Sequence, residues 1–131
     1  MKLGFLVLSF VFLLMLLSNT KAFVGFGSVT NGNWFNVSWN YRVRIEVNST
    51  LNMTNWPIEH RINFTDLLPS GEFDINSTRV FEHDSQGRII REMPFQFELD
   101  SSYNSSSNAA GTIVFLMNGT TVAGNKRIFY V

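Results

Sequence analysis

The feature that most constrains the fold of this chain is a strict alternation of apolar and charged side chains. In residues 41–47 the odd positions are apolar and the even positions carry Arg or Glu. The same alternation returns in residues 58–64, where His60 takes an apolar position, and in residues 95–100. A period of two is typical of a strand with one buried and one solvent-facing side. These segments therefore predict three strands that each cover a core on one face.

The other elements extend this pattern without adding a long helix. Residues 113–117 are continuously apolar, which predicts a central strand buried on both faces, and residues 127–131 predict a last strand. Residues 84–87 contain Gly87 and lie between two strand-like segments, so they predict a hairpin loop. No segment of ten or more residues in the region after the N-terminal apolar run shows a period of 3.6.

The connections between these strands have their own signals. Residues 66–70 predict one helical turn that Pro69 stops. The polar residues 101–108 predict a mobile loop, and Gly119 and Gly124 bracket a loop before the last strand. Several short strands separated by turns predict an all-β fold, an antiparallel β-sandwich of immunoglobulin-like or jelly-roll-like type.

The N-terminus has the composition of a secretory signal. Lys2 is followed by an uncharged apolar run over residues 3–17, and then by polar residues and the small Ala22. Thr20 and Ala22 occupy the −3 and −1 positions of a cleavage site. We therefore predict a signal peptide over residues 1–22 and a single domain over 23–131. An uncleaved N-terminal membrane anchor is the alternative, although the run is shorter than the ~20 residues of a spanning helix.

The far end of the chain leaves a second question open. Residues 128–131 end within an apolar segment without a polar tail. The sequence is compatible with a natural terminus and with a domain that is cut short at its C-terminus.

Acceptor sites for Asn-linked glycans are unusually dense in this chain. Chance pairing of its 14 asparagines with its 22 serines and threonines would give about two Asn-x-Ser/Thr sites. The chain has seven: Asn36, Asn48, Asn52, Asn63, Asn76, Asn104 and Asn118. Because a glycan must face solvent, the sites and the leader together predict a glycosylated protein that is secreted or exposed on the cell surface.

Composition excludes several classes of function. Residues 23–131 carry eight Lys/Arg and ten Asp/Glu with no basic stripe, so we expect no nucleic-acid partner. There is no cysteine, which removes thiolate nucleophiles, thiolate metal sites and redox motifs. The two histidines, His60 and His83, are not at the spacing of zinc ligands. We expect no cofactor.

Two further clusters of polar residues could be a catalytic or metal site, or could be ordinary solvent-exposed residues. Residues 82–85 offer an acid, a base and a hydroxyl, but adjacent strand residues point to opposite faces, so we expect no catalytic residues. Glu72, Asp74 and Asn76 would share one face of a strand and could approach Ca²⁺, although they are too few for a full shell. A solvated polar face is the expected account, and we predict no metal site.

Exposed aromatic residues are the candidates for ligand binding. Sugar rings stack on aromatic faces while nearby amides and carboxylates contact their hydroxyls. The candidate residues are Trp34, Trp39, Trp56 and Tyr103. Trp39 and Trp56 have an alternative role, because each precedes or opens a strand and could close one edge of the core.

Several short segments resemble a known kind of module. They are Trp39-x-Tyr41-Arg42, Ile62-Asn63-Phe64-Thr65 followed by Leu67-Leu68, Asp74-Ile75-Asn76-Ser77-x-Arg79-Val80, Pro94-x-Gln96-Phe97 and the run 110–117. This set resembles the N-terminal β-sandwich accessory module of large exported prokaryotic proteins, archaeal ones included, that work at the cell surface or on polysaccharides. The resemblance implies an accessory unit ahead of other domains, and no catalytic motif accompanies it.

The sequence thus predicts a non-catalytic β-sandwich module with a binding or structural role. Its expected partners are polysaccharide or cell-envelope components, with membrane contact only through an uncleaved N-terminus. Two alternatives stay open: the accessory part of a polysaccharide hydrolase or lyase, and a subunit of a surface layer or filament whose open sheet edge pairs with a neighbour.

Overall fold

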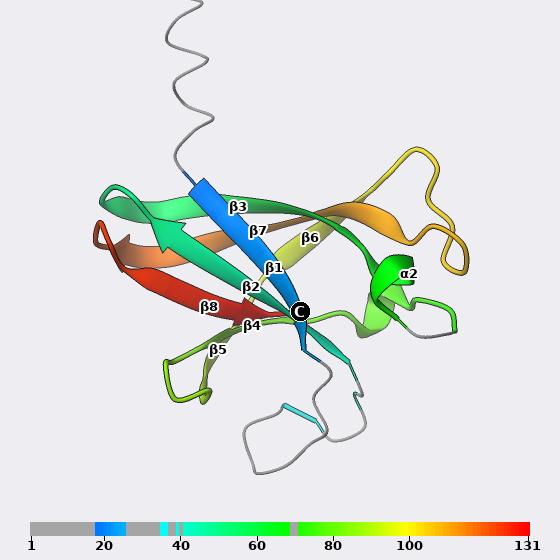
Figure 1. Ribbon diagram of the computed structural model, residues 1–131, viewed down its shortest axis with the longest axis horizontal. Helices are drawn as coiled ribbons and strands as arrows, with labels where there is room; N and C mark the ends of the chain where they lie inside the picture. Colours follow the sequence, from blue (N-terminus) through cyan, green and yellow to red (C-terminus); the bar gives the residue numbers. More distant parts are fainter. Residues whose placement is uncertain (1–17, 26–34, 37–38, 40, 69–70) are drawn as a thin grey trace, which may run out of the picture.

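The computed structural model describes residues 18–25, 35–36, 39, 41–68 and 71–131, with the backbone alone described for 18–25. They form two antiparallel sheets (Figure 1). The five-stranded sheet has the order β1-β2-β8-β4-β5, from strands Ser18–Gly25, Arg42–Ser49, Lys126–Tyr130, Val80–His83 and Ile89–Met93. The three-stranded sheet has the order β3-β7-β6, from Met53–Asn63, Ala110–Thr121 and Phe95–Leu99. The predicted all-β sandwich is confirmed.

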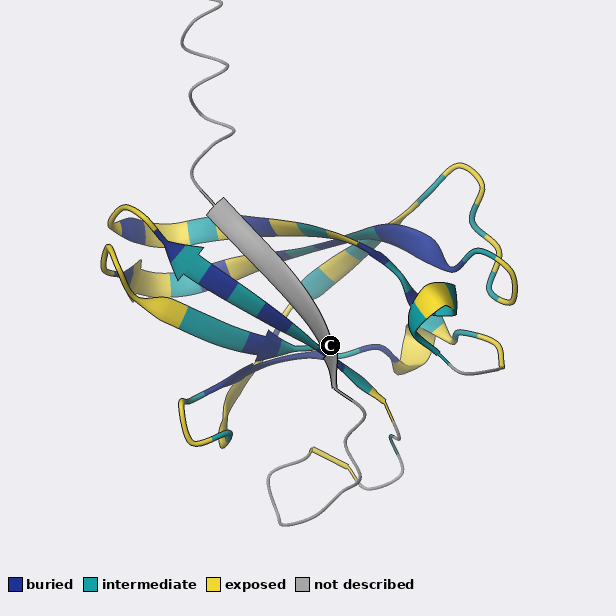
Figure 2. Ribbon diagram, in the orientation of Figure 1, coloured by how far each residue is buried: buried dark blue, intermediate teal, exposed yellow. Residues whose placement is uncertain are grey.

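The core lies between the two sheets and draws on both. Val43, Ile45 and Val47 of β2 are buried, as are Ile113 and Met117 of β7. The rings of Phe115 and Phe129, which come from opposite sheets, have centroids 4.8 Å apart. Figure 2 shows buried and half-buried residues alternating along β2. The alternation that the sequence shows therefore follows the two faces of the strand.

The predicted strand faces are confirmed along β2 and β3 and wrong at three other positions. Tyr41 precedes β2 and is 45% exposed, because it lies beyond the end of the covering sheet. Leu99, at the end of the edge strand β6, is 52% exposed. Leu116 is 45% exposed, so β7 is not buried on both faces. The physical reason is that β7 is central within its sheet while the outer face of that sheet has no covering layer among the described residues.

The turns also follow the predictions in part. The Asp84 carboxylate accepts hydrogen bonds from the backbone amides of Gln86 and Arg88 and closes the β4–β5 hairpin. The predicted helical turn is α2 (Phe64–Leu67), which begins earlier than expected because the Asn63 side chain caps it. Pro69, its predicted stop, lies outside the described residues.

Two loop predictions need correction. The strand predicted to carry Glu72, Asp74 and Asn76 on one face does not form, because Asp74 caps the short 3₁₀ helix η2 (Ile75–Ser77). Gly119 lies inside β7, which continues to Thr121 across a bulge opposite Asn55.

The polar tract after β6 is held by a regular set of hydrogen bonds. Asn104 and Asn108 exchange two backbone hydrogen bonds of 2.9 Å each. The Asn104 side-chain oxygen also accepts from the backbone amides of Ser106 and Ser107. The side chains of this tract thus close its own turns.

The predicted cleavage point after Ala22 falls within strand β1. It pairs with β2 along its full length, from Ser18 opposite Ser49 to Gly25 opposite Arg42. Cleavage after Ala22 would leave only Phe23 to Gly25 of this strand. Residues 1–17 of the predicted signal peptide lie outside the described part of the chain. No helix within that part has the length and apolar character to cross a membrane.

A buried ionic cluster links the two sheets next to the core residue Phe129. Glu82 of β4 and Arg127 of β8 both point inward, and Arg127 Nε donates to Glu82 Oε1 at 2.7 Å. Arg127 Nη1 reaches across to the Asn118 carbonyl and the Thr121 hydroxyl of β7. Arg91 Nε lies 3.0 Å from Glu82 Oε2, without the alignment of a hydrogen bond.

Candidate functional site

A groove opens at the end of the sandwich that carries α2 and η2. Its volume is about 420 Å³, within the range of ~300–1,000 Å³ that small-molecule sites occupy. Its lining comes from the start of β2, from α2, from the segment before β4 and from the end of β8: Trp39, Tyr41, Arg42, Val43, Phe64, Leu68, Glu72, Phe73, Asp74, Ser77, Thr78, Arg79 and Val131. The groove thus combines an apolar floor with charged and hydroxyl groups.

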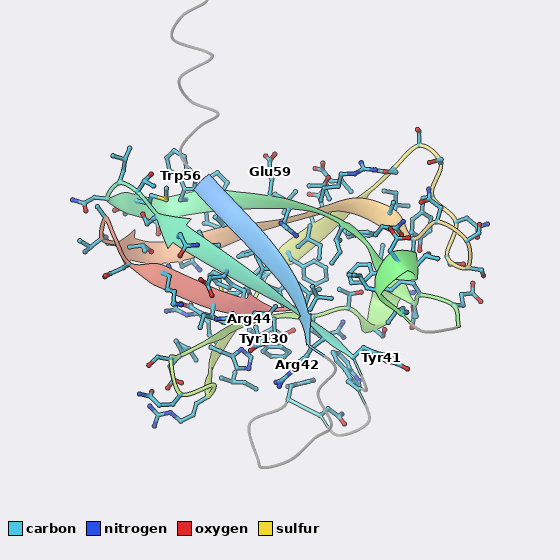
Figure 3. All side chains as sticks on the ribbon, in the orientation of Figure 1. Tyr41, Arg42, Arg44, Trp56, Glu59 and Tyr130 are labelled. Carbon is cyan, nitrogen blue, oxygen red and sulfur yellow. The ribbon has the colours of Figure 1, made fainter. Side chains whose placement is uncertain are left out.

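Aromatic rings form much of this site. Tyr41 projects at the start of β2 (Figure 3), where the opposing sheet no longer covers it. Trp39 is half-buried and meets the edge of Phe35 with ring centroids 5.3 Å apart. Phe64 and Phe73 stack with centroids 4.0 Å apart and join the groove to the core. Two rings are therefore accessible at the groove while two others support its floor.

Charged groups are held at fixed places around these rings. The Arg79 guanidinium lies 5.5 Å from the centroid of the Trp39 ring and donates to the carbonyls of Asn76 and Thr78. Glu72 accepts a 2.5 Å hydrogen bond from the Ser105 hydroxyl. Each of these bonds uses part of the side chain and fixes its direction, which leaves other donor and acceptor positions for a ligand.

One polar group of the lining is buried without a partner. Thr78 is 7% exposed, and its hydroxyl oxygen has no hydrogen bond to any described residue. Buried hydroxyl groups in folded proteins almost always have a partner, and this one borders a groove. The Thr78 hydroxyl is thus placed to bind a water molecule or a hydroxyl of a ligand.

The three predicted ligand-binding aromatics that the structure describes do not come together. Trp39 alone among the described ones lines the groove. Trp56 lies on β3 with Glu59, well away from Tyr41 and Arg42 (Figure 3), and packs against the core. Tyr103 also packs against the core, beside Phe97 at a centroid distance of 6.5 Å. Trp34 lies outside the described residues.

Sequence reasoning missed Tyr41 because it occupies an apolar position of the alternating pattern. Its place at the very start of the strand was the available signal, since the first residue of a strand often extends past the core. Sequence reasoning also missed Thr78 and Arg79. Thr78 belongs to the Asn76 acceptor site, and neither residue stands in a pattern that indicates ligand binding.

All seven acceptor asparagines are described, and none is buried. Asn48, Asn52 and Asn118 belong to the end with the β2–β3 and β7–β8 turns, where the hydroxyls of Thr54 and Thr120 in two of the sites bond to each other at 3.0 Å. Asn63 caps α2, Asn76 lies in η2 and Asn104 lies in the loop that contacts Glu72 through Ser105. These last three sites thus lie at the groove end, and Asn36 lies near Trp39, whose amide donates to its carbonyl.

The two histidines lie outside the groove and on different sheets. His60 points inward from β3 and is half-buried, and burial lowers its pKa from the usual 6.5. His83 is buried on the other sheet, where its ring meets Tyr130 at 4.6 Å. Within the described ranges no three His, Asp or Glu side chains gather closely enough to hold a metal ion. Glu82 and His83 point to opposite faces of β4, as expected for adjacent strand residues.

Comparison of the chain with protein-family models, with curated proteins and with solved structures finds no match in any of the three. The resemblance to an accessory module therefore stays a prediction, and the function is argued from the groove alone.

Proposed function

We propose that this chain is an exported, glycosylated and non-catalytic module that binds carbohydrate in the groove beside Trp39 and Tyr41. The observation that carries the proposal is the combination of two accessible aromatic rings with charged groups held in place. A sugar ring offers an apolar face for stacking and hydroxyls for hydrogen bonds. The groove offers both kinds of contact within one volume.

The polar groups of the groove suit hydroxyl recognition. Glu72 and Asp74 are exposed acceptors on one side, and Arg79 is a donor on the other. The buried Thr78 hydroxyl adds a group that can both donate and accept. A neutral or weakly charged polyhydroxyl ligand fits this mixture better than a strongly charged one, because both signs of charge line the groove.

The binding test uses a glycan array followed by calorimetry on the purified chain. We expect Tyr41→Ala and Trp39→Ala each to weaken binding of the best glycan by about tenfold, which corresponds to ~1.4 kcal/mol. Leu116→Ala on the outer face of β7 and Trp56→Phe on β3 are the matched controls and should leave affinity unchanged. If no glycan binds, or if the controls weaken binding equally, the proposal is wrong.

Export is tested separately by the mature N-terminus and by peptide mass. The proposal expects secreted material that begins at Phe23 and carries hexose-containing mass on several of the seven asparagines. Secreted material that retains Ser18 would instead show that β1 is kept whole. A chain recovered only from the cytosol without glycans would contradict this part of the proposal.

A further inference from the structure

The groove lies beside one of the chain's own acceptor asparagines. Asn76 is exposed in η2, and its chain neighbours Asp74, Ser77 and Thr78 all line the groove. We infer that the carbohydrate that first occupies the groove is the glycan attached to Asn76 itself. This inference rests on the proposed carbohydrate binding and names the source of the ligand.

The local contacts connect Asn76 to the aromatic rim. Arg79 Nη1 donates to the Asn76 carbonyl at 2.9 Å, and the same guanidinium lies 5.5 Å from the centroid of the Trp39 ring. The Arg79 side chain thus lies between the backbone of Asn76 and the Trp39 ring. A glycan that leaves Asn76 starts at the groove and needs no long linker to reach Trp39.

The side chain of Asn76 is available to carry a glycan. Its backbone amide donates to Asp74 Oδ1 at 2.9 Å, but its side-chain amide makes no hydrogen bond with any described residue. Asn63, the other acceptor next to a groove residue, differs, because its amide contacts Asn108 at 3.5 Å and its oxygen caps α2. The third acceptor at this end, Asn104, reaches the groove only through Ser105 and Glu72. Asn76 is thus the best placed of the three.

The burial of Thr78 indicates that glycan attachment at Asn76 precedes folding. Its hydroxyl belongs to the Asn76 acceptor site and is buried in the folded chain. The enzyme that attaches the glycan requires the Ser or Thr of the site, so attachment at Asn76 must precede folding of this segment. The glycan is then already in place when the groove forms around η2.

Tethering makes occupancy by this glycan favourable even when the contacts are weak. A ligand on a short linker has an effective concentration of ~1 mM. A groove with a dissociation constant of ~0.1 mM for the free sugar would then be about 90% occupied from within. A separate polysaccharide would bind with an apparent affinity about tenfold weaker than to the empty groove.

The experiment compares two sources of the same sugar. The probe is the oligosaccharide released from the purified chain's own asparagines. We expect it to bind Asn76→Gln about tenfold more tightly than the glycosylated wild type, and to bind the control Asn52→Gln, altered at the far end, like the wild type. Equal affinity for Asn76→Gln and wild type would overturn the inference while leaving carbohydrate binding intact. No binding to Asn76→Gln at millimolar concentration would instead remove the proposed function.

A second measurement needs no added sugar. In chains with isotope-labelled glycans, the Asn76 glycan should relax in NMR as slowly tumbling protein, and Tyr41→Ala should release it to rapid motion. The Asn52 glycan should stay mobile in both proteins. An Asn76 glycan as mobile as the one on Asn52, or peptide mass showing Asn76 unmodified, would overturn the inference.

Discussion

Two polar regions of this sandwich differ in the kind of interaction that holds their groups. In the ionic cluster, Glu82 is paired with Arg127 and Arg91, and Arg127 also bonds to β7 across the core. Ion pairing holds this cluster even though Glu82 Oε2 and Arg127 Nη2 make no hydrogen bond with any described residue. At the groove, the buried Thr78 hydroxyl has no partner among the described residues, and the ring of Tyr41 projects from the end of the fold. The comparison shows that opposite charges join the two sheets within the cluster, whereas the groove places an uncharged hydroxyl and an accessible ring at the end of the sandwich.

Removal of the charge of Glu82 should produce the largest loss of stability. Glu82→Gln leaves the mostly buried Arg127 and the neighbouring Arg91 without a counter-ion, and breaking a buried pair on one side costs about 3–5 kcal/mol. Urea unfolding measures this loss. The control Glu92→Gln removes an exposed carboxylate 3.5 Å from Arg79 and should cost less than ~1 kcal/mol. Similar costs for both variants would mean that the cluster does not join the sheets.

A substitution that introduces a steric clash should cause a smaller loss of stability. It lies beneath the aromatic residues that support the groove. A side-chain carbon at Gly111 would lie 2.5 Å from the Glu98 carbonyl and 2.6 Å from the Phe97 ring, which packs on Phe64 and Phe73. We expect Gly111→Ala to cost about 1–3 kcal/mol in thermal unfolding. Thr112→Ala, one position along on the outer face, is the control and should stay within ~0.5 kcal/mol. An unchanged melting temperature for Gly111→Ala would show that β6 moves away without cost.

Features that depend on neighbours along the chain can be predicted from this sequence, and features that depend on residues far apart in it cannot. The alternation over residues 41–47 predicts the faces of β2 because it depends only on neighbours along the chain. Burial of Glu82 is not predictable in this way, since its partner Arg127 is 45 residues distant. The exposure of Leu116 likewise depends on the other elements and not on its own segment, because no described residues form a layer over the outer face of β7. The groove escapes prediction because α2, η2 and the end of β8 meet only in three dimensions.

A third substitution, in the groove, should increase the free energy of unfolding, whereas the substitution in the ionic cluster should decrease it. Thr78→Val keeps the shape of the side chain and removes a buried hydroxyl that has no partner in the described part of the chain, which should stabilise the fold by about 1 kcal/mol. Since the change also destroys the Asn76 acceptor site, both proteins are to be produced without glycans and compared by urea unfolding. Ser77→Ala in the same segment, where the hydroxyl donates to the Asp74 carbonyl, should destabilise instead. A loss of stability in Thr78→Val would mean that a water molecule already satisfies the hydroxyl.

The smallest effect should come from His60, a polar group between the sheets that belongs to neither region. Burial lowers its pKa in the folded chain below 6.5, so the unfolded chain takes up a proton first as the pH falls. The free energy of unfolding should therefore decrease as the pH drops below about 6.5, and level off below the folded pKa. His60→Gln should lose this dependence when unfolding is followed between pH 5 and 8, whereas Glu92→Gln should retain it. An unchanged pH profile in His60→Gln would assign the dependence to another group between the sheets.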